Sequence, residues 1–267
     1  MNEIILIASK EFTERLKNGW ILAIAVSFML FSVIISFAGL GFTGSIGQPD
    51  QEITLLSLTS LVIYLVPLLG LILGYDSISG EHEQGTLDLL HSCPISSGQI
   101  LFGKWTGLSA VLMFALTIGM IIPAVIAVYQ GQDVIPWLWF LVLSMWFGIV
   151  FVTLSLMMST TLWSRGRLLG LVIGLWLIFI ILFDVILIGL LVATEGNISN
   201  ILIDTLFFLN PASVFRFLVI QGLFGDATLV QMGFGNHIPT ITALITALIL
   251  WTILPLWFAR LKFSTGK

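Results

Sequence analysis

Acidic residues gather in one short polar segment of a chain that is otherwise strongly apolar. Residues 75–94 read YDSISGEHEQGTLDLLHSCP and carry four carboxylates, those of Asp76, Glu81, Glu83 and Asp88. Ser79 is expected to cap a short helix here, whose first-turn carboxylates complement the positive end of the helix dipole. Ile78, Leu87 and Leu90 would form its buried stripe, and Pro94 would end it. Such a helix is suited to docking in a groove on a soluble partner, and an ordinary solvated loop is the alternative.

The same segment contains side chains of types that can bind copper. His82, His91 and Cys93 offer imidazole and thiolate groups, but their spacing matches no established local metal-binding motif. The methionines of the apolar stretches are scattered, as packing residues of a membrane protein are, at positions Met29, Met113, Met120, Met145, Met157 and Met158. We therefore expect no metal site, and interpret the two histidines and the cysteine as polar loop residues.

The sequence lacks the residue patterns that hydrolysis and nucleotide binding require. The His-Glu-x-x-His and Gly-x-Ser-x-Gly patterns are absent, which argues against an intramembrane metalloprotease and a nucleophile-elbow hydrolase. Residues 98–104, GQILFGK, approach a phosphate-binding P-loop, but Trp105 stands where Ser or Thr would coordinate magnesium. Apolar residues also lead straight on into a membrane span. We expect the chain to be non-catalytic and to bind neither ATP nor another cofactor.

The composition puts most of this chain in a membrane. Hydrophobic residues make up 58% of it and charged residues 9%, against roughly 45–50% and about 25% in a soluble domain. A soluble enzyme is therefore excluded, and no nucleic-acid partner is expected. The net charge of −4 says less than the distribution of the charges does. The lone cysteine rules out an internal disulfide.

Long charge-free stretches divide the chain into membrane spans. Residues 18–49, 53–75 and 134–164 carry no charge, and each stretch exceeds the roughly 20 residues that cross about 30 Å of hydrocarbon. Unbroken runs of this length favour helices over membrane strands. The sequence predicts a single all-α integral membrane domain over residues 1–267, with six transmembrane helices at about 20–41, 54–75, 105–129, 136–162, 168–193 and 240–259.

The basic residues predict the orientation of these spans. Of the ten Lys and Arg residues, nine flank the spans on the side of the two termini, and only Arg216 falls on the other side. Cytoplasmic loops carry the excess of Lys and Arg. We therefore expect both termini in the cytoplasm, with a cytoplasmic segment at 76–104 and a periplasmic segment at 194–239.

One acid falls well inside a predicted span. A carboxylate in hydrocarbon costs several kcal/mol by most estimates, so Asp184 is expected to face protein or a watery cavity. The functional hypothesis is a place on the transport pathway. A structural hydrogen bond or a protonated carboxyl group is the alternative.

Two further segments lie outside the predicted spans. Residues 1–19 repeat apolar side chains every four positions, as in a helix lying in the headgroup plane, unless they simply extend the first span. In the segment 194–239, Pro211 can start a helix in which Val214, Phe215 and Leu218 share a face. We interpret Asn210, Pro211 and Arg216 as candidates for an external gate or docking surface, and interfacial helices that shield the span ends are the alternative.

The acidic segment resembles a known family. Gly80-Glu-His-Glu-Gln-Gly-Thr-Leu-Asp-Leu-Leu, then Pro94 and Gly103-Lys104, is similar to the pattern of type-2 ABC exporter permeases. In that family the segment forms a coupling helix against the nucleotide-binding subunit. The resemblance implies an ATPase-coupling role for the residues that match position by position: Glu81, Glu83, Gly85, Thr86, Leu87 and Pro94. The six-span plan extends the likeness over the whole chain.

A narrower resemblance is to the permease subfamily that serves the maturation of nitrous-oxide reductase. It rests on residues 98–104, Phe183-Asp184, Glu195-Gly196 and Leu209-Asn210-Pro211, with Arg216 shortly after. The likeness implies a homodimer in a bacterial inner membrane, with two cytoplasmic ATPase subunits that bind ATP and magnesium. It also implies a periplasmic copper-accessory partner of β-helical type.

Three functions follow from these resemblances. The first is to move a copper- or sulfur-related species, or transmit ATPase motion, in copper-site assembly of nitrous-oxide reductase. The second is to export a lipid, drug or glycan. The third is that of a mechanical transducer that passes no substrate.

Overall fold

The structure is a computed structural model that describes residues 2–17, 19–42, 51–87, 95–161, 164–195, 200–225 and 239–265. Within these residues the chain is helical and has no strand, which confirms the all-α prediction. Five helical stretches are long and apolar enough to cross a membrane: Gln51–Glu83, Ser97–Tyr129, Val134–Thr161, Arg165–Ala193 and Ile241–Ser264. They match the second to sixth predicted spans. The helix α2 (Gly19–Phe42) occupies the position of the first predicted span, and within it Ala25–Ile35 is a shorter apolar stretch.

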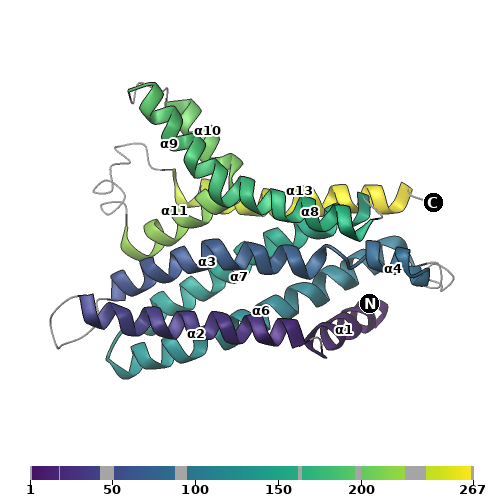
Figure 1. The fold of residues 1–267 in the computed structure, drawn as a ribbon, viewed down its shortest axis with the longest axis horizontal. Coiled ribbons are helices and arrows are strands. Elements are labelled where there is room, and N and C mark those ends of the chain that lie inside the picture. Colours follow the sequence, from purple (N-terminus) through teal and green to yellow (C-terminus); the bar gives the residue numbers. More distant parts are fainter. Residues whose placement is uncertain are drawn as a thin grey trace.

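The long helices run side by side in a bundle (Figure 1). Its members are α2, α3 (Gln51–Gly74), α6 (Ser97–Tyr129), α7 (Val134–Thr161) and α13 (Ile241–Thr265). The helix α7 is central, since it contacts α3, α6 and α13 and 67% of its apolar window is buried. The short helices α1 (Asn2–Lys17) and α4 (Ser79–Glu83) lie at one end of the bundle, which we call the α4 end.

Glycine brings α3 and α7 into close contact. A Cβ atom at Gly70 would lie 2.8 Å from the carbonyl oxygen of Gly148, and one at Gly148 would lie 2.8 Å from the side chain of Val66. The hydroxyl of Ser155 also donates a hydrogen bond to the carbonyl oxygen of Leu71. Small residues let helix backbones approach closely in a membrane, where van der Waals packing and hydrogen bonds hold helices together. The α3–α7 pair therefore forms the tightly packed centre of the bundle.

The helix α6 begins at Ser97, ahead of the predicted start of the third span at residue 105. Ser96 and Gln99 form a capping box: the Ser96 hydroxyl accepts from the Gln99 N–H, and the Gln99 side chain accepts from the Ser96 N–H. These bonds satisfy two amides at the helix start. Residues 98–104, which approach a P-loop in sequence, are therefore turns of a helix.

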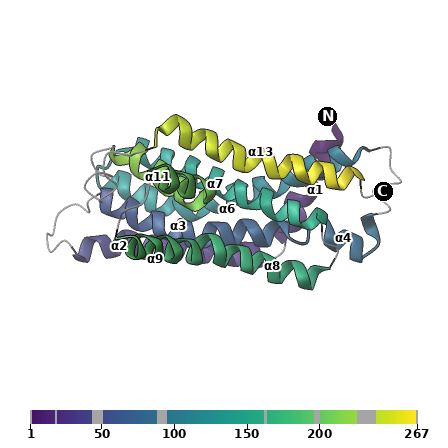
Figure 2. The ribbon, with the colours of Figure 1, turned by 90° about the horizontal axis from the view of Figure 1, so that it is seen from above.

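The fifth predicted span is one continuous helical stretch with a bend. It consists of α8 (Arg165–Leu177), the π-helix η1 (Ile178–Leu182) and α9 (Phe183–Ala193), and we call it the arm. The helix α8 follows the bundle, on the side opposite α13, while α9 diverges from it (Figures 1 and 2). Short π-helical segments are recognised causes of helix kinks. Only 11% of the apolar 18-residue stretch of the arm is buried, so the arm is the least packed of the five candidate spans.

The segment after the arm enters the bundle. It contains α10 (Asn200–Leu209) and α11 (Pro211–Phe224), which begins at the proline predicted to start a helix. Val214, Phe215 and Leu218 are fully buried, and the Phe215 ring stacks on Phe147 of α7 with 4.4 Å between centroids. The shared face of these three residues is confirmed. It packs against helices of the bundle, so α11 does not merely lie across the ends of the spans.

Candidate functional site

A serine of α7 positions the start of α4. Ser159 Oγ accepts hydrogen bonds from the N–H groups of Ile78, at 3.1 Å, and Ser79, at 3.0 Å. The Ser79 hydroxyl instead donates back to the carbonyl oxygen of Tyr75 at 3.0 Å, and α4 has no side-chain cap of its own. The cap predicted at Ser79 is wrong, because a hydroxyl from another helix already satisfies the first amides. Sequence spacing gave no signal for Ser159, which lies about 80 residues along the chain.

Glu81 joins α4 to α1 and α6 through a buried lysine. Lys104 of α6 is 1% exposed, and its Nζ lies 2.8 Å from Glu81 Oε1 and in direct contact with Glu11 Oε1 of α1. A second lysine, Lys10 of α1, places its Nζ 3.6 Å from the same oxygen, Glu81 Oε1. A buried ion persists only with good partners, so these charges hold three helices in one arrangement.

Arg15 adds a second link between α1 and the α4 end. Its Nη2 donates to Asp76 Oδ1 at 2.8 Å, and its Nε lies 3.7 Å from Glu11 Oε2. Burial lowers the pKa of the Arg15 guanidinium, but the charges and hydrogen bonds of Asp76 and Glu11 outweigh burial and raise that pKa above its usual value. Arg15 is therefore a permanent cation, and Glu11 is shared between it and Lys104.

Glu83 reaches from α4 to the start of the arm. Its Oε1 accepts from the backbone N–H of Arg165 at 2.9 Å, and its Oε2 lies 3.5 Å from Arg165 Nε. Gly80 leaves room for this arginine, because a Cβ atom there would lie 2.3 Å from Arg165 Nη2. A carboxylate at a helix N-terminus satisfies a free amide and complements the helix dipole. Glu83 therefore caps α8 from a different helix.

Apart from two buried apolar residues, the rest of the α4 segment faces outward. Ile78 and Leu87 are buried at 0% and 3% exposure, which confirms the stripe predicted for them, while residues 82–86 are exposed. The hydroxyl of Thr86 donates to the carbonyl oxygen of Glu81 at 3.2 Å. Both carboxylates predicted to meet a partner thus contact cations of this chain, and the exposed surface lies on the residues around Glu83.

Gly85 makes the turn that ends α4. Its φ angle is +70°, and its N–H donates to the carbonyl oxygen of His82 at 3.0 Å. Glycine adopts this left-handed conformation readily, whereas a Cβ atom makes it unfavourable. The glycine of the acidic sequence pattern therefore has a backbone role in this chain.

A polar cavity of about 220 Å³ lies between α1, α4 and the arm. Carboxylates and guanidinium groups line it together: Glu11, Glu14, Arg15, Asp76, Ser77, Glu81, Gln84 and Arg165. Among the described residues, no group of three or more His, Cys, Asp or Glu side chains is arranged to hold a metal ion. Leu90, the third residue of the predicted stripe, lies outside the described residues, as do His91, Cys93 and Pro94.

A second polar cluster lies at the bend of the arm. Arg216 Nη2 of α11 donates to Asp184 Oδ2 at 2.9 Å, and the two side chains are 38% and 32% exposed. Asn210 caps α11 by accepting from the Ala212 N–H at 2.9 Å, and its amide donates to the carbonyl oxygen of Phe179 in η1 at 2.8 Å. We call Asp184, Arg216 and Asn210 the clasp. The structure thus brings the predicted pathway residue together with the predicted gate residues.

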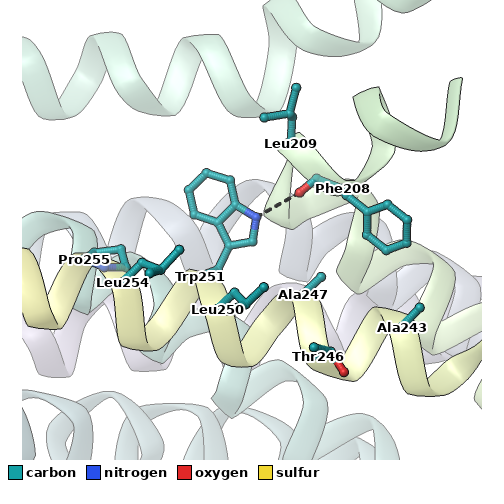
Figure 3. Close-up of a pocket in the computed structure, with 9 residues that line it drawn as sticks. All are labelled: Phe208, Leu209, Ala243, Thr246, Ala247, Leu250, Trp251, Leu254 and Pro255. Atoms are coloured by element: carbon teal, nitrogen blue, oxygen red, sulfur yellow. Dashed lines mark hydrogen bonds between the residues drawn. The ribbon is translucent and has the colours of Figure 1, made fainter. Parts of the chain in front are cut away.

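An apolar groove of about 520 Å³ lies between α10 and α13 (Figure 3). Trp251 forms one wall, held by a hydrogen bond from its Nε1 to the carbonyl oxygen of Phe208 at 3.0 Å. The Thr246 hydroxyl is likewise engaged, donating to the carbonyl oxygen of Thr242. The groove therefore presents mainly hydrocarbon, and no predicted site residue that the structure describes lines it.

These features define a membrane-embedded helical protein whose charged groups hold helices to one another. The sequence model of the family described as ABC-2 family transporter protein matches residues 5–267. The chain therefore belongs to the ABC-2 family of transporter proteins, which confirms the resemblance seen in the acidic segment.

Two relatives match nearly the whole chain. It is 33% identical over 264 residues to the probable ABC transporter permease protein NosY of Stutzerimonas stutzeri, covering 96% of this chain and 94% of the relative. It is 35% identical over 258 residues to the protein of the same name from Pseudomonas aeruginosa, covering 94% and 92%. Both relatives are named as permease components, which agrees with the narrower resemblance.

Proposed function

We propose that this chain is the membrane permease of an ATP-driven transporter that supports copper-site assembly of nitrous-oxide reductase. The observation that carries the proposal is the identity of 33% and 35% to two NosY permeases over nearly their whole length. The chain would move a copper- or sulfur-related species across the inner membrane, or transmit ATPase motion to a periplasmic partner. ATP and magnesium would be bound by a separate subunit.

The arrangement in the membrane is part of this proposal. The helix α2 and the five longer stretches would make six spans, with the α4 end and both termini in the cytoplasm. Lys10, Arg15, Lys104 and Arg165 all lie in the charge cluster at the α4 end, as the positive-inside rule requires of a cytoplasmic end. Ile5 and Leu6 on the outer face of α1 are exposed, which supports contact between this helix and the membrane surface.

Coupling to the ATPase would take place at residues 82 and 84–86. Since Glu81 and Glu83 already have cations within the chain, they would position α4, and the exposed residues between and after them would contact the partner. Each permease would bind one ATPase subunit there. A transporter with two ATPase subunits therefore needs two permease copies.

A homodimer is supported by the outer half of the arm. Val185, Ile186, Ile188 and Val192 are all more than half exposed on α9, a helix with no buried residue. An apolar patch of this kind marks a surface that contacts lipid or another protein. Association of two copies about a twofold axis would cover it with the same surface of the second copy.

The mechanical transducer is the second candidate, and the arm favours it. The arm is fastened to α4 at one end, through Glu83, and its other end diverges from the bundle. Movement at α4 would therefore reach the far end of the molecule without a substrate passing through. A periplasmic β-helical copper-accessory protein would be the recipient of that movement.

Complementation tests the proposed function. A Pseudomonas aeruginosa strain that lacks its NosY relative would receive this chain together with its own ATPase partner. We expect the chain to restore nitrous-oxide reduction and the copper content of the purified reductase. A strain that expresses the chain in its membrane and still makes copper-deficient reductase would contradict the proposal.

A further inference from the structure

We propose that Glu83 is a positioning residue that transmits the movement of α4 to the arm. The inference rests on the proposed function, because it takes α4 to be the helix that an ATPase moves. It goes further by naming which of the two acids carries the movement onward, and to which part of the membrane domain.

The start of the arm is held by few contacts, and Glu83 provides the polar ones. Among the residues of α8, only Leu168 and Val172 are buried. Glu83 binds the first residue of α8 through its backbone N–H at 2.9 Å, so it holds the helix end itself as well as a side chain. A displacement of Glu83 therefore pulls directly on the axis of α8.

Glu81 has the opposite role, because its partners are fixed. Its carboxylate contacts Lys104, which is 1% exposed and bound to Glu11 of α1. Helix α1 is in turn packed tightly on α6, where a Cβ atom at Gly107 would lie 2.7 Å from the carbonyl oxygen of Ala8. Glu81 and the Ser159 bonds thus form the pivot of α4, whereas Glu83 lies on its moving side.

The arm also has a fixed point near its middle. The clasp ties η1 and the start of α9 to α11, through Asn210 to Phe179 and Arg216 to Asp184, and α11 is buried in the bundle. Trp176 adds a bond from its Nε1 to the carbonyl oxygen of Tyr64 at 3.0 Å. Beyond the clasp, α9 has no buried residue. An arm held at its middle and free at its end turns that end when its start is moved.

Distance measurement between two labels tests the inference. After replacement of Cys93 by serine, cysteines would be introduced at Val192, near the end of α9, and at Ile135, at the start of the packed helix α7. Spin-labelled permease, diluted with unlabelled copies, would be reconstituted in lipid nanodiscs with its ABC ATPase. We expect ATP and magnesium to shift the distance between the labels in the otherwise unchanged chain.

Variants of Glu83 and Arg165 separate the transmission of movement to the arm from binding of the ATPase. Glu83→Leu should abolish the ATP-dependent shift while the affinity for the ATPase stays unchanged, because residues 82 and 84–86 remain exposed. Glu83→Gln keeps an acceptor oxygen for the Arg165 N–H and should retain most of the shift. Arg165→Ala keeps the backbone donor and should behave in the same way. Glu14→Gln, an exposed change on α1, is the matched control.

The possible outcomes are distinct. A normal shift in Glu83→Leu, or no shift in the unchanged complex with the ATPase bound, overturns the inference and leaves the proposed function standing. Loss of ATPase binding in Glu83→Leu also overturns it, since Glu83 would then serve only the shape of α4. An ATPase that fails to bind the unchanged chain rejects the proposed function itself.

Discussion

Lys104 lies about two turns inside the long helix α6, and two carboxylates contact its buried ammonium group. Its partners Glu11 and Glu81 come from helices far apart in sequence, and each is shielded from solvent. Charges this deep are stable only as a set, because the desolvation penalty of each is offset by the others. The cluster of Lys104, Glu11 and Glu81 is therefore expected to be destabilised as a whole by the loss of any one member.

Removal of the lysine should destabilise the protein strongly. Lys104→Met removes the buried cation from Glu11 and Glu81 and leaves them only the longer contacts to Arg15, at 3.7 Å, and Lys10, at 3.6 Å. Breaking one partner of a buried ion pair costs about 3–5 kcal/mol. We expect a clear fall in the thermal unfolding temperature of the purified protein in detergent. Lys17→Met, on the exposed side of α1, is the control and should leave unfolding unchanged. Equal unfolding temperatures for both variants would contradict the buried cluster.

Gly85 offers a second test at the residue scale. Gly85→Ala places a Cβ atom at φ +70°, which costs roughly 1–2 kcal/mol, and Gly85→Pro also removes the N–H that bonds to His82. We expect ATPase pull-down and ATP turnover to fall in Gly85→Ala and to be lost in Gly85→Pro, with normal membrane insertion of both. Gly166→Ala, where no neighbour lies within 4 Å, should keep both activities. Normal coupling in Gly85→Pro would rule out the coupling role of α4.

Among the elements, the arm is the one whose behaviour depends on a few polar contacts. Its bend coincides with the π-helix η1, and the clasp lies at that bend. A π-helix is rare and often marks a functional position in a helix. The ion pair between Asp184 and Arg216 joins the start of α9 to α11, so it fixes the geometry of the arm at its bend.

Exchange of the two charges tests the clasp. Asp184→Leu leaves Arg216 without its carboxylate near the membrane interior, so we expect loss of transporter function with normal membrane expression. The double variant Asp184→Arg with Arg216→Asp restores an opposite pair and should recover part of the function. Copper loading of nitrous-oxide reductase in the complemented strain is the measurement. Asp133→Asn, an exposed change in another loop, serves as the control.

Full function in Asp184→Leu would leave the carboxylate without a functional role. Failure of the charge exchange to recover any function would mean that Asp184 acts by itself and not through Arg216. Both results would count against the clasp as a fixed point of the arm.

At the scale of the whole molecule, cations from several helices gather at one end. The α4 end collects the cations of α1, α6 and the arm, and Arg260 of α13 lies there too, since its Nε would be 3.8 Å from a Cβ atom on Gly98. At the other end, the Gln51 side chain of α3 donates to the carbonyl oxygen of Asp133, just before α7. We expect this distribution of cations to set the orientation of the molecule in a membrane.

Cysteine labelling measures that orientation directly. In a chain without Cys93, a cysteine at Gly225 should react with an impermeant reagent added to sealed cells, because it follows α11 on the predicted periplasmic side. A cysteine at Gln84 should react only after the cells are opened. A cysteine at Gln48, between the first two predicted spans, should behave as Gly225 does. Labelling of Gln84 in sealed cells would reverse the topology.

Composition and charge spacing by themselves predicted the membrane class and the helical spans of this protein, and the resemblance of its acidic segment indicated the family. Apolar runs must become helices in hydrocarbon, and the acidic segment with Gly85 is a local pattern whose turn depends on one backbone angle. The buried positions of Ile78 and Leu87 were predictable from helical periodicity. The helix that begins at Pro211 was predictable because proline favours the first turn of a helix.

Tertiary structure alone decided where the charges go. Glu81 finds Lys104 and Glu11, Glu83 finds the first amide of α8, and Asp184 finds Arg216, each across a separation that no sequence period encodes. Ser159 replaces the cap expected from Ser79 for the same reason. In a dry interior, a charge or amide must be paired by whichever group the packing of the helices brings within reach, and that packing is a property of the whole fold.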